Sequence, residues 1–99
     1  MRVSLVFQKK VALNTTSYSF YFAKPSGFIF QAGQYLQVSF SHDETFGSRF
    51  FTIASAPSEE MLMITTKRSQ SLFKKKLFSL KKGESITGFG PMGTFGTKV

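Results

Sequence analysis

The sequence predicts an all-β fold: six short antiparallel strands that close into a barrel, with one short α-helix near the end of the chain. Segments in which apolar and polar residues alternate recur along the sequence, as in half-buried strands. Turn-forming residues separate them. Only the stretch from Ser69 to Leu80 has the apolar spacing of a helix. Closure into a barrel would remove the exposed edges of such a sheet.

The first two strands are expected at Val3 to Val11 and at Ser17 to Ala23, which are rich in β-branched and aromatic residues. Asn14, Thr15 and Thr16 lie between them and supply turn chemistry. The two strands should therefore form a hairpin. A Lys-Pro-Ser-Gly run follows and interrupts the pattern.

Three more strands are predicted in the middle of the chain. Leu36, Val38 and Phe40 alternate with more polar residues, so one face of their segment should be buried. A polar loop then leads to a strand that begins at Arg49, and Pro57 lies in the turn before the fifth strand. The segments are Tyr35 to Phe40, the strand from Arg49, and Met61 to Lys67.

The helix and the sixth strand complete the barrel. Ser69 or Ser71 can cap the helix, and Gly83 is expected to end it. Gly90 to Gly93 should form a turn that cannot continue a regular ladder. The last strand is predicted at Glu84 to Phe89, and the residues spaced as on one face of the helix are Leu72, Phe73, Lys76, Leu77 and Leu80.

Length and composition limit the chain to one small domain, residues 1–99. It contains no cysteine, which excludes disulfides, thiolate metal sites, iron–sulfur ligation and cysteine nucleophiles. No apolar run is long enough to span a bilayer, and the N-terminus is interpreted as a strand rather than a signal peptide. A cytoplasmic location, or the cytoplasmic face of a membrane complex, is expected.

The net charge of +8 favours an anionic partner: a phosphate, a nucleic acid, an acidic membrane or an acidic protein. A basic solvated helix face would also account for part of it. His42, beside Asp43 and Glu44, is interpreted as part of a solvated loop, and no metal site is predicted. Seven of the cations lie close together in the sequence: Lys67, Arg68, Lys74, Lys75, Lys76, Lys81 and Lys82.

The segment from Arg49 to Pro57 is the strongest candidate for a binding site. On a strand, Arg49 and Phe51 point one way while Phe50 and Thr52 point the other. A guanidinium can bind phosphate through two parallel hydrogen bonds, and a flat ring can stack on a conjugated ligand. These residue types suit a planar, phosphorylated ligand.

The predicted helix start is the second candidate. Backbone amides in the first turn lack intrahelical partners and lie at the positive end of the helix dipole. The amides of Leu72, Phe73 and Lys74 are therefore expected to hold a pyrophosphate beside Arg49, with Ser71 as the cap. An ordinary capped amphipathic helix is the alternative interpretation.

These segments, with Phe30 to Phe40, Thr65 to Leu77 and Gly88 to Phe95, together resemble the flavin-binding barrel domain of the ferredoxin reductase-like oxidoreductases. The resemblance implies a Greek-key barrel that binds FAD, or alternatively FMN. It implies that Arg49 binds phosphate, that Phe51 stacks on the isoalloxazine ring, and that Thr52 contacts the polar edge of that ring. Thr52 would be the catalytic side chain.

The resemblance also places Phe50, Thr66 and Lys67 among the cofactor-binding residues, together with Ser71, Leu72, Phe73 and Lys74 of the helix. This sequence has Phe51 where the family more often has Tyr. Gly90, Pro91 and Gly93 resemble the family's Gly-Pro-x-Gly turn, for which a plain turn is the alternative.

Complete members of the family carry a nicotinamide-nucleotide domain after the barrel, which this chain lacks. That domain is expected downstream or in trans, and an acidic redox protein is a candidate partner. The isolated chain is not expected to oxidise NAD(P)H efficiently. Two alternatives stay open: a flavin-free module that docks a redox partner, and, ranked last, a barrel that binds single-stranded nucleic acid.

Overall fold

The computed structural model describes residues 1–40 and 43–93. His42 and the residues after Gly93, among them Phe95, lie outside this description. The first two strands, β1 (Arg2–Ala12) and β2 (Ser17–Ala23), form the predicted hairpin. Asn14 Oδ1 accepts hydrogen bonds from the amides of Thr16 and Ser17 at 2.9 and 2.8 Å. The turn chemistry expected of Asn14 is therefore confirmed.

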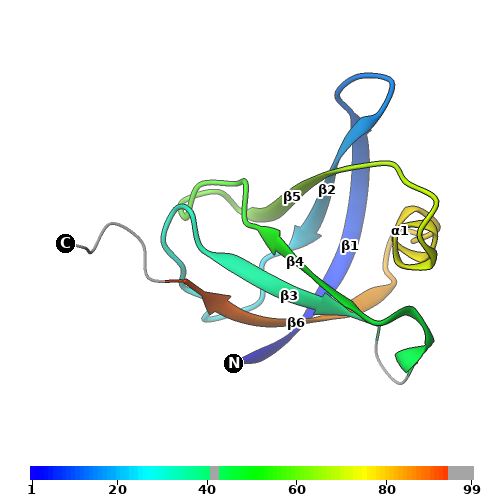
Figure 1. Cartoon of the computed structure of the whole chain (residues 1–99). Coiled ribbons are helices and arrows are strands. Elements are labelled where there is room, and N and C mark those ends of the chain that lie inside the picture. The colour runs from blue at the N-terminus through cyan, green and yellow to red at the C-terminus, as the bar shows by residue number, and fades with distance from the viewer. Residues whose placement is uncertain (41–42, 94–99) are drawn as a thin grey trace.

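The strands form one antiparallel sheet in the order β4-β3-β6-β1-β2-β5. The sheet curls until its edge strands approach each other (Figure 1). Just after β4, the amide of Ala54 donates to the carbonyl of Met63 in β5 at 2.7 Å. This arrangement is the predicted barrel. The remaining strands are β3 (Tyr35–Ser39), β4 (Ser48–Thr52), β5 (Met61–Lys67) and β6 (Ser85–Met92).

The helix α1 (Leu72–Phe78) packs at one end of the barrel (Figure 1). It buries Phe73, Leu77 and Phe78, and the Phe78 ring meets the Phe20 ring edge-on at 4.9 Å. Phenylalanine is the commonest residue of the core, to which the strands, α1 and the segments between strands all contribute aromatic rings. A short 3₁₀-helix, η1 (Glu44–Phe46), lies in the segment that was expected to be a loop.

The helix ends earlier than predicted. Ser79, not Gly83, is its C-cap, and the Ser79 hydroxyl and amide both donate to the carbonyl of Lys76, at 2.7 and 3.1 Å. A serine that binds the preceding turn in this way competes with continuation of the helix. Gly83 instead lies in the turn before β6, at a φ of 95°.

The last predicted turn is also corrected, because β6 continues through Gly90 and Pro91 to Met92. The register against β3 shifts between Tyr35 and Gln37, so the strand absorbs an irregularity without ending. A Cβ atom on Gly90 would lie 3.1 Å from the carbonyl oxygen of Tyr35. A residue without a side chain therefore permits this close approach.

Candidate functional site

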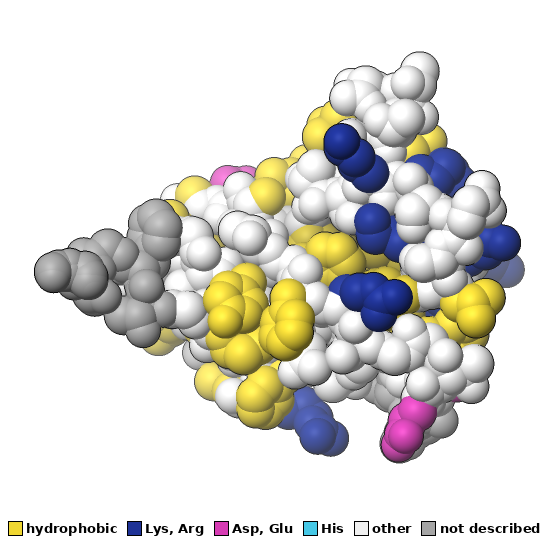
Figure 2. All heavy atoms as spheres, viewed as in Figure 1, with side chains coloured by type: hydrophobic (Ala, Val, Ile, Leu, Met, Phe, Trp, Pro, Cys, Tyr) yellow, Lys and Arg dark blue, Asp and Glu magenta, His cyan; other side chains and the backbone are white. Residues whose placement is uncertain are grey.

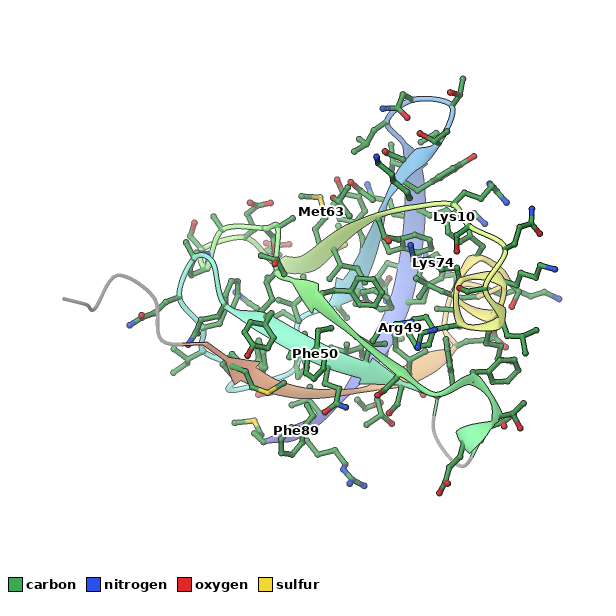
Figure 3. The ribbon with its side chains drawn as sticks, viewed as in Figure 1. Lys10, Arg49, Phe50, Met63, Lys74 and Phe89 are labelled. Carbon is green, nitrogen blue, oxygen red and sulfur yellow. The ribbon has the colours of Figure 1, made fainter. Side chains whose placement is uncertain are left out.

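Strand β4 directs its side chains to two different surroundings, as the alternation predicted. Arg49 and Phe51 point toward α1, where the Phe51 ring lies 5.9 Å from the Phe73 ring. Phe50 and Thr52 point outward. Figure 3 shows Arg49 directed at the helix and Phe50 directed away from it. The strand thus joins a cationic surface to an aromatic surface.

Arg49 lies at the junction of β4 and α1. Its guanidinium carbon is 5.3 Å from the centroid of the Phe73 ring, and Nη1 donates to the carbonyl of Ser48 at 2.8 Å. Both of these partners are uncharged, so they orient the guanidinium without neutralising it. The side chain is exposed and can reach an anion in solvent.

Ser71 caps the helix as predicted. Its hydroxyl accepts a hydrogen bond from the Lys74 amide at 3.1 Å, and its carbonyl accepts the first helical bond, from Lys75, at 3.0 Å. The amides of Leu72 and Phe73 precede that first bond. They lie in the helical turn next to Arg49, because Phe73 is the ring that the guanidinium covers.

Lys74 is the second cation of this junction. Its ammonium donates to the carbonyl of Lys67 at 2.8 Å. The pKa of Lys74 is lowered, chiefly because burial disfavours its charged form and also because Arg49 repels it. Two cations from separate elements are thus held close together, and a bound phosphate would relieve their repulsion.

An aromatic hollow of about 360 Å³ lies on the outward side of β4 and is lined by Tyr35, Phe50 and Thr52. Tyr35 is paired with Thr52 across β3 and β4. The Tyr35 and Phe50 rings meet edge-on at 5.7 Å. In Figure 2, hydrophobic side chains gather on this face, to one side of a group of basic side chains.

The two phenylalanines of β4 differ sharply in exposure. Phe50 is 60% exposed, whereas Phe51 is 8% exposed and belongs to the core. The open ring beside Arg49 is therefore that of Phe50. Phe51 forms part of the apolar support beneath the Arg49 side chain, together with Phe73.

Comparison with known proteins places the chain in a protein family. Residues 4–86 match the family described as FAD-binding domain. The chain belongs to this family. No curated protein matches the chain in sequence. FAD is therefore the cofactor of its family, in agreement with the cofactor expected from the sequence.

Solved structures share the fold of this FAD-binding domain. A ferredoxin NADP+ reductase from Neisseria gonorrhoeae, with bound FAD and NADP, superimposes with a TM-score of 0.76 at 16% identity, over 90% of this chain and 38% of that one. A ferredoxin-NADP+ reductase from Plasmodium falciparum with 2'P-AMP gives 0.81 at 16% identity, over 98% and 41%. A cytochrome P450 reductase from Amycolatopsis gives 0.77 at 16% identity, over 98% and 30%. The chain thus spans less than half the length of these proteins.

The other predicted residues of the FAD-binding domain lie on β5. Lys67 contributes its backbone carbonyl to Lys74, while Thr66 is paired with Tyr18 of β2. Sequence reasoning missed Tyr35, which lines the aromatic hollow. Its alternation with Leu36 indicated an outward position, but only the β3–β4 register brings it beside Phe50 and Thr52.

A larger hollow, of about 1000 Å³, lies elsewhere on the FAD-binding domain. It is lined by side chains of both charge signs, among them Arg2, Asp43 and Glu44, together with Phe89 and Gln37. It lacks the paired cations that meet at Arg49 and Lys74. Chemistry rather than size therefore favours the β4–α1 junction as the cofactor site.

Proposed function

We propose that the chain holds FAD for an NAD(P)H-dependent oxidoreductase and positions its isoalloxazine ring for electron transfer. The observation that carries the proposal is the junction of β4 and α1. There Arg49 and Lys74 form a cationic pair, and the exposed Phe50 ring follows Arg49 directly along β4. A ligand with a diphosphate and a planar ring matches both surfaces.

The residues divide between the two halves of the cofactor. Arg49 and Lys74 would neutralise the pyrophosphate, with hydrogen bonds from the amides of Leu72 and Phe73. Phe50 and Tyr35 would contact the ring, and Phe51 with Phe73 would support the site from below. Bound FAD would accept a hydride and release electrons singly or in pairs.

Thr52 is the candidate for the reacting edge of the ring. It lines the aromatic hollow beside Phe50 and Tyr35, and it is exposed. Its hydroxyl can donate a hydrogen bond to a ring nitrogen or carbonyl oxygen. Thr52 would thus orient the ring and stabilise charge that develops on that edge during reduction.

Several partners follow from the family and its relatives. The Neisseria relative is described with both FAD and NADP, and this chain covers 38% of it. We infer that a nicotinamide-nucleotide domain, in the same protein or in trans, completes the enzyme. The excess of basic residues favours an acidic redox protein as the electron partner, and a cytoplasmic setting suits both.

Titration of the chain with FAD, FMN and riboflavin tests the proposal. Binding should follow the order FAD, FMN, riboflavin, because riboflavin lacks the phosphates that Arg49 and Lys74 would hold. Flavin fluorescence and the visible spectrum report the binding. Absence of binding to all three would favour a flavin-free interaction module instead.

A further inference from the structure

The β1–β2 hairpin carries an unusual surface at its tip. It projects beyond the body of the barrel (Figure 1). Leu13 is 56% exposed and Val11 is 40% exposed, although both are apolar. The hairpin-tip surface combines them with the surrounding cations; it consists of Lys9, Lys10, Val11, Leu13, Lys67 and Arg68.

The pairing of β2 with both β1 and β5 brings these residues close together. Ser17 of β2 is opposite Lys67 of β5, and the Arg68 amide donates to the carbonyl of Thr16 in the hairpin turn at 2.7 Å. Val11 is opposite Ser19, which shares a face with Ser17. The end of β5 thus places two cations directly beside the hairpin tip.

Lys10 and Arg68 are held on the side of the hairpin that faces α1. Lys10 donates to the carbonyl of Phe78 at 2.7 Å, and the Arg68 guanidinium lies 4.5 Å from the Phe78 ring. Neither contact supplies a negative charge. Lys9, by its alternate position, lies on the opposite side of β1. Cations therefore surround the hairpin on both faces.

All the charged residues of the hairpin-tip surface are basic. Residues 1–42 and 61–83 of the sequence contain no Asp or Glu. The five acidic residues lie in other segments, at Asp43, Glu44, Glu59, Glu60 and Glu84. The hairpin-tip surface is therefore complementary to a surface that carries many negative charges.

We propose that the hairpin-tip surface attaches this domain to an anionic lipid bilayer. The apolar Leu13 and Val11 come later along the projecting strand than Lys9 and Lys10, so they would enter the acyl boundary while the cations remain among the headgroups. A projecting tip with exposed apolar side chains suits a deformable bilayer, because such side chains can insert among lipids without a preformed pocket on the partner.

The proposal is independent of flavin binding. Arg49, Phe50 and Thr52 do not belong to the hairpin-tip surface, and attachment requires neither FAD nor a second domain. Lys67 belongs to the surface by its side chain, whereas its contact with Lys74 is made by its backbone carbonyl, which Lys67→Gln retains. The paired substitution Lys9→Gln with Lys67→Gln removes two cations of the tip. Its matched control, Lys81→Gln with Lys82→Gln, gives the same net charge but changes the turn before β6.

Cosedimentation with vesicles of phosphatidylcholine containing phosphatidylglycerol tests the proposal. Each basic residue near such a surface strengthens binding about fivefold, so the tip pair should weaken partitioning about 30-fold and the control pair far less. Leu13→Ser should weaken partitioning on the order of tenfold. Ile29→Ser should not weaken it, because Ile29, although 82% exposed, lies outside the hairpin-tip surface. Thermal unfolding verifies that every variant folds.

Three results would overturn the proposal. Equal losses in the two charge pairs would indicate attraction by net charge alone. An unchanged affinity in Leu13→Ser would show that the tip does not enter the bilayer. Failure of the wild-type chain to sediment with anionic vesicles would show that the basic surface serves another partner, whether or not the chain binds a single-stranded oligonucleotide.

Discussion

Replacement of Arg49 by alanine is the most informative perturbation of the proposed FAD site. The guanidinium is preoriented by Ser48 and Phe73, so little ordering is required when a phosphate binds. A hydrogen bond to a charged group contributes about 1.5–3 kcal/mol. Because Arg49 is exposed, we take about 2 kcal/mol, which corresponds to a roughly 30-fold weaker affinity for FAD.

Riboflavin separates this effect from a general loss of structure. It lacks phosphate, so its affinity should change less than about twofold in Arg49→Ala. The variant also loses the contact with Phe73, about 0.5–1 kcal/mol, and Tm should fall by about 2–8 °C. Arg2→Ala removes a guanidinium from another face and should leave FAD affinity unchanged. Fluorescence titration measures both ligands; equal losses for FAD and riboflavin would refute the phosphate role of Arg49.

Three further predictions concern neighbouring residues. Phe50→Ala should weaken FAD binding about threefold to tenfold without lowering Tm, whereas Phe51→Ala should cost about 3–5 kcal/mol of stability, as thermal unfolding and titration will show. Ser71→Ala should lower stability by about 1 kcal/mol through loss of the helix cap, measured by urea unfolding. The pKa of Lys74 is lowered from 10.5, so FAD affinity should fall as pH rises through that lowered pKa; Lys74→Arg should retain affinity to higher pH in the same titration.

The sequence predicted the order and type of the elements because their signals are local. Alternation placed β2 at its observed bounds, the turn at Pro57 preceded β5 as predicted, and Asn14 marked the hairpin turn. The irregularity at Gly90 was interpreted as a turn because glycine and proline break a ladder, yet a shift of register allowed β6 to continue. A local sequence signal carries no information about the neighbouring strand, here β3, against which the register shifts.

The candidate site was predictable only in part. Alternation separated Phe50 from Phe51, but two consecutive phenylalanines do not reveal which one faces the core. That choice depends on α1, whose Phe73 packs against Phe51. The part played by Tyr35 depends on the β3–β4 register. Pairings between segments distant in sequence therefore decide which rings stay open to a ligand.

Amide chemical-shift mapping with added FAD tests the central claim most directly. The account predicts the largest shifts at residues 49–52 and 71–74, with further shifts at Tyr35, and none beyond background around the hollow that contains Arg2 and Phe89. Shifts concentrated at Arg2 and Phe89, with Arg49 and Lys74 unaffected, would contradict it.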